Sequence, residues 1–220
     1  MLKKVINNIL HVKINDLKLK GNLIKTLKIG IVLIVLSVVN IILNGFSFGW
    51  ISNLTRDYNS YELIFLVLRI FLFATIEELI FRVIIQKSIY DATNKTKKDA
   101  IITIIVSSII FSLFHLVNAV SDYSKSEIIM QMWSTCIAGI YLGSIYMKTE
   151  NWLGCAIIHT IHNISVGIVC SLEGEVSNVI LYNITYAFNN IEEIILLISS
   201  IYILKKIKLP KESEDLKNET

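Results

Sequence analysis

Long apolar stretches alternate with short polar segments along almost the whole chain. A helix needs roughly 20 apolar residues to cross a bilayer, so each stretch is a candidate span. The predicted spans cover residues 23–43, 61–90, 100–117, 128–147 and 152–172, with a sixth inside 180–207. The sixth has no sharp start, because polar side chains between positions 189 and 193 interrupt its apolar run. The pattern predicts an all-α, polytopic transmembrane helix bundle of about six spans.

The composition agrees with a membrane protein. Hydrophobic residues make up 54% of the 220 positions, and the single proline is Pro210. That is too apolar for a soluble domain of this size. We expect an N-terminal arm at 1–22, a bundle at 23–207 with its motif core at 61–172, and a polar tail at 208–220. The arm interleaves lysines with apolar residues, which is typical both of a helix on an anionic membrane surface and of a solvated basic leader.

Lysine and arginine residues fall unevenly on the two sides of such a bundle. If both termini are cytoplasmic, 18 of the 21 lie in cytoplasmic segments or toward the cytoplasmic ends of spans, Arg69 lies within a span, and only Arg56 and Lys125 lie in external loops. Cytoplasmic loops of membrane proteins carry this excess of positive charge. We therefore predict a multi-pass protein of the cell membrane with both termini in the cytoplasm. Its expected partners are membrane lipids, and no nucleic acid.

The second predicted span contains two adjacent carboxylates and a guanidinium, Glu77, Glu78 and Arg82. Ionised groups in hydrocarbon cost at least a few kcal/mol each, so they seldom lie there without a role. Glu78 and Arg82 are four apart and can pair on one helix face, whereas Glu77 points about 100° away and has no such local partner. One paired and one unpaired carboxylate suggest a structural acid and a working acid. A buried ion pair that only holds the bundle together is the alternative.

Two further polar clusters lie in other spans. The third span ends in His115, and the fifth contains His159, His162 and Asn163. His159 and Asn163 are four apart and share a helical face, while His162 is displaced from it. A single histidine in a span is usually a packed core residue. Polar clusters on three separate spans favour a common site near the cytoplasmic side of the bundle.

The residue types favour activation of a water molecule. The sequence has no GxSxG elbow for a serine nucleophile. A carboxylate base with two imidazoles and an amide suits hydrolysis, with an imidazolium, an amide or a metal stabilising the oxyanion. The HExxH spacing of zinc peptidases is absent. The sequence therefore leaves a zinc ion open, with His115 and His159 as its candidate ligands.

The order of the three motifs resembles one known family. Glu77–Arg82 reads EExxxR, Phe111–His115 reads FxxxH, and His159–Asn163 reads HxxxN. These motifs lie on the second, third and fifth predicted spans. The chain is similar here to the CPBP family, which comprises CAAX prenyl endopeptidases and bacteriocin-processing enzymes, also called Abi proteins. The resemblance implies that Glu77 activates water and that Glu78 with Arg82 organises the site. It also implies that His115, His159 and Asn163 complete the centre.

The sequence departs from that family in two places. His162 lies inside the third motif and could compete with His159. Val83 follows Arg82 where many members have glycine, so we expect a less bent helix.

Three classes of function are compatible with polar residues inside the spans. The first is an intramembrane endopeptidase that cuts a short or lipidated peptide substrate. The second is a non-proteolytic membrane partner, such as a bacteriocin self-immunity or sensor-kinase accessory protein. The third, a small transporter, usually shows internal repeats, and we find no repeat in the sequence. Complete motifs favour the endopeptidase.

Overall fold

The computed structural model describes residues 1–48, 60–120, 124–171 and 179–207, and within these ranges it is helical and contains no strand. The predicted all-α class is confirmed. The elements are α1 (Leu2–Leu10), η1 (Ile14–Leu17), α2 (Leu23–Ile29), α3 (Ile31–Phe48), α5 (Ser60–Glu78), η2 (Leu79–Gln86), α6 (Lys87–Asp91), α7 (Lys97–Phe114), η3 (His115–Val120), α8 (Lys125–Thr149), α9 (Trp152–Ser171) and α10 (Val179–Lys205).

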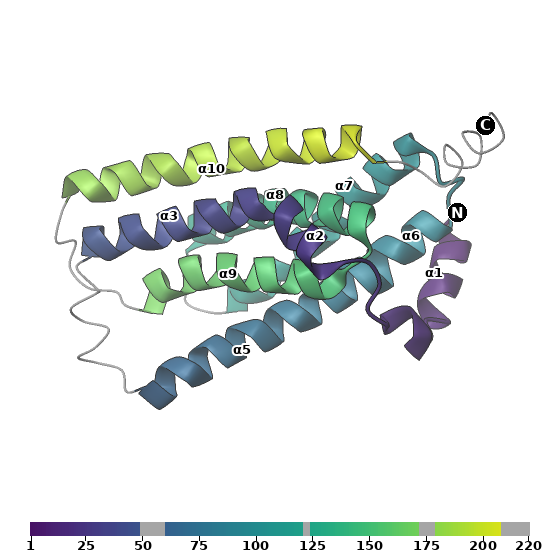
Figure 1. Cartoon of the computed structure of the whole chain (residues 1–220), viewed down its shortest axis with the longest axis horizontal. Coiled ribbons are helices and arrows are strands. Elements are labelled where there is room, and N and C mark those ends of the chain that lie inside the picture. Colours follow the sequence, from purple (N-terminus) through teal and green to yellow (C-terminus); the bar gives the residue numbers. More distant parts are fainter. Residues whose placement is uncertain (49–59, 121–123, 172–178, 208–220) are drawn as a thin grey trace.

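The long helices run roughly along one axis and form a bundle (Figure 1). Helix α9 packs against α3, α5 and α8, while α10 packs against α3 and α8. The buried core of the bundle includes Leu33, Tyr141, Leu142, Ile145 and Ile158, none of which has exposed surface. Many large apolar side chains on the outer faces of α3, α5, α7 and α10 are exposed. A contiguous apolar exterior of this kind is typical of a surface that faces lipid.

The second predicted span is one continuous helix from Ser60 to Asp91, built from α5, η2 and α6. Its middle section, η2, is a π-helix of eight residues that begins directly after Glu78. The sequence did not predict this change of helix type. Short π-helical segments are rare and occur frequently at functional sites.

The first predicted span is broken rather than continuous. Helices α2 and α3 meet at an angle of 62° around Gly30, whose N–H still donates to the carbonyl of Thr26. A Cβ at Gly30 would lie 2.2 Å from Cδ1 of Ile158. Glycine therefore permits the close approach of this corner to α9.

Three described helices are long and apolar enough to cross a membrane, and the bent pair raises the number to four. The three are Lys97–Asn118, Lys125–Thr149 and Val179–Lys205. Helix α5 carries Glu62, Arg69, Glu77 and Glu78, which lowers its apolarity. The six-span count and the cytoplasmic termini stay predictions, and the expected tail at 208–220 lies outside the described residues.

Local sequence signals place the ends of α7, α8 and α9. Capping boxes begin α7 at Thr96 and α8 at Ser124, where side chain and backbone exchange hydrogen bonds with the third residue of the helix. Helix α8 ends at Glu150, which has a left-handed conformation (φ 52°). Asn151 then accepts a hydrogen bond of 2.7 Å from the N–H of Gly154 and starts α9. This tight turn fixes the register of α9 against α8.

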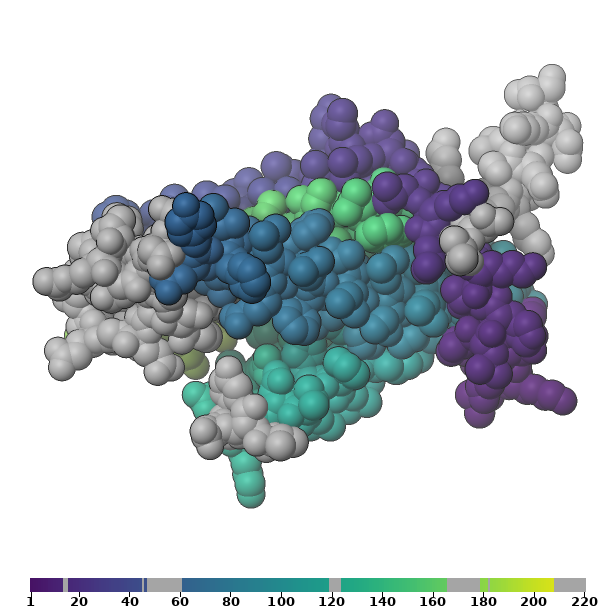
Figure 2. Space-filling view, turned by 90° about the horizontal axis from the view of Figure 1, so that it is seen from below, coloured from purple at the N-terminus to yellow at the C-terminus, as the bar shows by residue number. Residues whose placement is uncertain are grey.

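The N-terminal arm folds back onto one end of the bundle (Figure 1). The indole N–H of Trp152 donates to the carbonyl of Leu17 at 2.9 Å. The amide of Asn8 donates to the carbonyl of Ser88 at 3.1 Å. Residues 13–22, which we call the strap, thus lie across the start of α9, whereas α1 packs beside α6 and has no buried residue. In Figure 2, α1 forms one end of the molecule and the outer face of α5 lies open beside α9.

Candidate functional site

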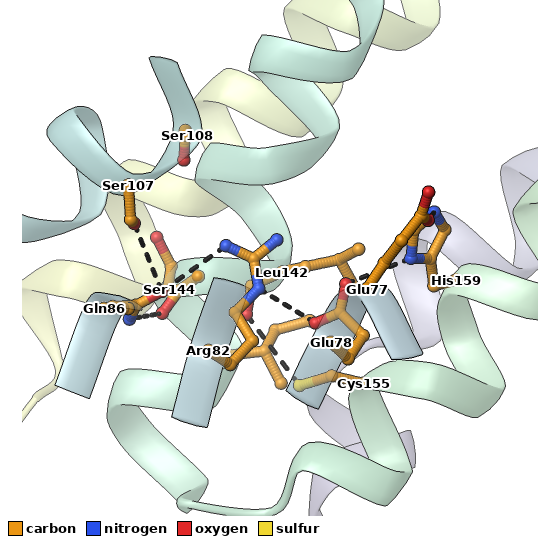
Figure 3. A network of polar contacts seen from close by, with 12 residues as sticks. Glu77, Glu78, Arg82, Gln86, Ser107, Ser108, Leu142, Ser144, Cys155 and His159 are labelled. Atoms are coloured by element: carbon orange, nitrogen blue, oxygen red, sulfur yellow. Dashed lines mark hydrogen bonds and ion pairs between the residues drawn. The ribbon is translucent and has the colours of Figure 1, made fainter. Parts of the chain in front are cut away.

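Glu78 and Arg82 form the predicted ion pair. The Nε atom of Arg82 donates to Oε2 of Glu78 at 2.8 Å, and neither side chain has exposed surface (Figure 3). Glu78 is the last residue of α5 and Arg82 lies in the π-helix η2. Charges removed from water in this way must be paired and hydrogen-bonded, because an isolated one is strongly destabilising.

A third polar residue, Gln86, continues this row by another four positions. Its Oε1 accepts from Nη1 of Arg82 at 3.4 Å, and its Nε2 donates to the carbonyl of Gly143 on α8 at 2.9 Å. The hydroxyl of Ser107 on α7 also donates to Oε1 of Gln86, at 3.5 Å. Sequence reasoning missed Gln86, although a glutamine four residues after Arg82 in an apolar run was a usable signal.

The carbonyl of Gly143 is accessible to Gln86 because position 143 has no side chain. A Cβ there would lie 3.0 Å from Oε1 of Gln86 and 3.3 Å from Nη1 of Arg82. The glycine therefore lets three helices meet around one buried polar row.

His159 on α9 links the two carboxylates. Its Nδ1 lies 3.0 Å from Oε1 of Glu78, and its Nε2 lies 3.6 Å from Oε2 of Glu77 (Figure 3). Since Glu78 already accepts from Arg82, the carboxylate accepts from His159 as well, and Nδ1 carries the hydrogen. This leaves Nε2 directed at Glu77. Glu77 has no partner on its own helix, as expected, but His159 approaches it from α9.

The two carboxylates differ in their access to solvent. The side chain of Glu77 is 22% exposed, whereas that of Glu78 is completely buried. Glu78 is held by two hydrogen-bond donors, and Glu77 makes only the longer approach to Nε2 of His159. A substrate or a water molecule can therefore reach Glu77 but not Glu78.

The FxxxH motif places Phe111 and His115 at the end of α7, beside this network. The ring of Phe111 makes edge-to-face contacts with His115, with centroids 4.9 Å apart, and with His159, with centroids 5.9 Å apart. It also packs on Phe81 and lies 5.8 Å from the guanidinium of Arg82. Nδ1 of His115 donates to the carbonyl of Phe111 at 3.0 Å, which leaves its Nε2 available. Phe111 is thus the spacer that sets His115 next to His159.

Two residues of the third motif lie apart from the carboxylates. Asn163 is half-buried one turn beyond His159, and its amide has no hydrogen-bond partner within the described ranges. His162 points toward α10, where its Nδ1 lies 3.7 Å from Oε1 of the buried Glu192. The structure thus turns His162 away from the position of His159.

The geometry bears on two other chemistries, a bound metal ion and a cysteine nucleophile. In the part of the chain that the structure describes, no three His, Cys, Asp or Glu side chains gather closely enough to hold a metal ion. Zinc at His115 and His159 stays a prediction, and we derive no step through it. Cys155, one turn before His159, is completely buried and its Sγ approaches the carbonyl of Leu142 at 3.8 Å. That thiol is shielded from any substrate.

The bundle and its buried Glu–Arg–His network define a class of helical membrane protein with a polar centre among apolar helices. Residues 59–165, which contain all three motifs, match the family described as type II CAAX prenyl endopeptidase Rce1-like. The match covers just under half of the 220 residues, and it confirms the resemblance drawn from the motifs. No curated protein and no solved structure matches the chain significantly.

Proposed function

We propose that the chain is an intramembrane endopeptidase that hydrolyses a peptide bond in a short or lipidated peptide substrate, near the cytoplasmic face. The observation that supports this most is the partly exposed carboxylate of Glu77 facing Nε2 of His159, while Glu78 fixes the other ring nitrogen. A base with an oriented imidazole is the arrangement that general acid–base hydrolysis needs.

In this mechanism, Glu77 takes a proton from a water molecule while the water oxygen bonds to the carbonyl carbon of the substrate. A protonated His159 or His115 donates a hydrogen bond to the oxyanion that forms, because Nε2 of each ring is free of the helix backbone. The proton held by Glu77 then passes to the amide nitrogen as the C–N bond breaks. Glu78 and Arg82 keep the imidazole of His159 in place throughout.

The direct test is cleavage by the purified full-length chain in lipid nanodiscs. Farnesylated and unmodified peptides with internal quenchers serve as substrates, and mass spectrometry locates the cut. We expect Glu77→Gln to abolish cleavage and Glu150→Gln, which removes an exposed carboxylate from the α8–α9 turn, to leave it unchanged. Equal cleavage by wild-type protein and the Glu77→Gln variant contradicts the proposal.

A non-proteolytic membrane partner, for example an immunity or sensor-kinase accessory protein, is the second candidate. One observation favours it: the amide of Asn163 is not engaged with the carboxylates, so the third motif is only half used within the described residues. In this case the Glu77→Gln variant retains the protein's cellular function. The same variant therefore separates the two candidates.

A further inference from the structure

A cavity of about 560 Å³ lies at the end of the bundle where the strap crosses the start of α9. The strap forms one wall, α6 the second, and the turn between α8 and α9 the third. Its volume falls in the range of roughly 300–1,000 Å³ that is usual for small-molecule pockets. Neither Glu77 nor His159 lines the cavity, and of its lining residues Gln86 also bonds to Arg82 in the buried network.

The strap wall is held in place by defined contacts. Lys87 forms ion pairs with Asp16 at 3.4 Å and with Asp91 at 2.8 Å, and Asn151 donates to the carbonyl of Gly21 at 3.4 Å. Gly21 has a φ of +69°, and a Cβ there would lie 1.9 Å from the carbonyl oxygen of Thr149. Only glycine fits this crossing point, so the cavity wall is a built feature of the fold.

The charges lining the cavity are unbalanced. Five lysines and three carboxylates line it, and two of the carboxylates, Asp16 and Asp91, are already paired with Lys87 and Lys95. A hydrogen bond from the backbone N–H of Lys13, with the nearby Lys87, holds the pKa of Asp16 below its usual value although burial opposes this. The Asp16 carboxylate therefore remains ionised at neutral pH.

In the described ranges, no ion pair involves Lys18, Lys20 or Lys148. Lys20 acts on Asp16 only as a weaker, more distant charge. Glu150 is the one remaining carboxylate in the lining, and it is exposed. The surplus of positive charge faces the cavity beside the aromatic side chains of Tyr90 and Trp152. Such a site favours an anion that also carries an organic portion.

The position of the cavity restricts the source of that anion. The candidate spans α8 and α10 end at Thr149 and Lys205, next to the lining residues Glu150 and Ile207. The cavity therefore lies at the level where a bilayer changes from hydrocarbon to headgroups. Beside it, α1 exposes Leu2, Ile6 and Leu10 along with Lys3 and Lys4, the pattern of a helix that lies on an anionic membrane surface.

We propose that this cavity is a binding site for a phosphate ester at the membrane surface, in which Lys18, Lys20 and Lys148 bind the phosphate and the aromatic side chains contact the organic portion. An anionic phospholipid headgroup is the source that the position favours, and a soluble phosphate ester has the same chemistry. The site does not depend on peptidase activity.

Native mass spectrometry of the purified full-length chain tests this. The probes are phosphatidylglycerol and phosphatidylcholine with identical acyl chains, and the variant is Lys20→Gln/Lys148→Gln. We expect wild-type protein to retain phosphatidylglycerol preferentially and the variant to bind it about 25-fold more weakly, since each lysine near a headgroup contributes to anionic lipid binding. The matched control Lys28→Gln/Lys98→Gln removes two exposed lysines outside the cavity and should bind like wild type.

Single-residue variants and a competition experiment complete the test. If the double variant is unstable, Lys148→Arg should bind like wild type while Lys148→Gln alone binds roughly fivefold more weakly. Competition by glycerol phosphate supports a site that also takes soluble phosphate esters, whereas binding of the lipid alone supports the bilayer as the source. Equal binding of the two lipids, or equal losses in the cavity and control variants, overturns the proposal.

Discussion

Nδ1 of His159 lies 3.0 Å from Oε1 of Glu78, and this hydrogen bond joins the middle of α9 to the last residue of α5. Because Glu78 also accepts from Arg82, one buried carboxylate holds a cation on its own helix and an imidazole on another. The free Nε2 of His159 is thereby aimed at Glu77. The two glutamates therefore differ in both their partners and their exposure to solvent.

Replacing Glu78 should lower the stability of the fold more than replacing Glu77. Glu78→Gln leaves Arg82 buried without a counter-charge and weakens the hold on His159, so we expect a loss of about 3–5 kcal/mol in folding free energy. Glu77→Gln removes a partly exposed group with no close hydrogen bond and should leave stability near wild type. Melting temperature and membrane abundance of both variants measure this. Equal destabilisation by the two substitutions contradicts the assignment.

Substitutions of the two histidines on α9 should have different effects, one on cleavage and the other on stability. We expect His159→Ala to abolish cleavage, because it removes the group that faces Glu77. His162→Ala should preserve cleavage per folded molecule but lower the melting temperature, because it leaves Glu192 buried without the imidazole beside it. Cleavage is normalised to folded protein by size-exclusion chromatography. Loss of cleavage in His162→Ala with retention in His159→Ala would reverse the assignment.

Gln86 should act as a positioning residue for Arg82. Gln86→Met keeps the volume but removes the bonds to Arg82 and to the carbonyl of Gly143, at a cost of about 1–3 kcal/mol for the group left unsatisfied. We expect kcat to fall with little change in KM, since the side chain of Gln86 is completely buried. Asn44→Leu, which breaks the buried bond from the Asn44 amide to the carbonyl of Asn40 on α3, is the matched control. A purely structural role would lower both variants' stability equally without changing kcat.

The orientation of the bundle can be tested by cysteine labelling in a variant without native cysteines. The uneven distribution of lysine and arginine predicts that Lys125→Cys reacts with an impermeant reagent from outside the cell. Lys98→Cys, at the start of α7, should react only after the cytoplasmic side is opened. Labelling of Lys125→Cys from the cytoplasmic side alone would contradict six spans with cytoplasmic termini.

The contribution of zinc can be measured directly. The mechanism proposed for Glu77 and His159 uses side chains alone, so we expect cleavage to persist in protein that elemental analysis shows to be free of metal. Loss of cleavage on chelation, with recovery on addition of zinc, would instead support the sequence-based prediction that His115 and His159 bind the ion. In that case His159→Ala should also lower the zinc content.

The sequence predicted what depends on spacing within one helix. The Glu78–Arg82 pair needed only an i,i+4 relationship, and the helical course of residues 61–90 needed only an apolar run. Contacts between helices were harder, because the rotation of α9 decides that His159 faces Glu78 while His162 faces Glu192. Nothing in the residue pattern marked the π-helix η2 or the corner at Gly30. Both depend on which neighbour approaches, and the sequence does not show this.

The anchoring of the strap has a consequence for the order in which the protein is assembled. Leu17 is synthesised before its partner Trp152, which follows 135 positions later. At a typical translation rate, that interval is on the order of 10 s. The strap therefore cannot dock until most of the helices have been synthesised. Docking of the strap is a late step in biogenesis, and it closes the bundle only after α9 has begun to emerge.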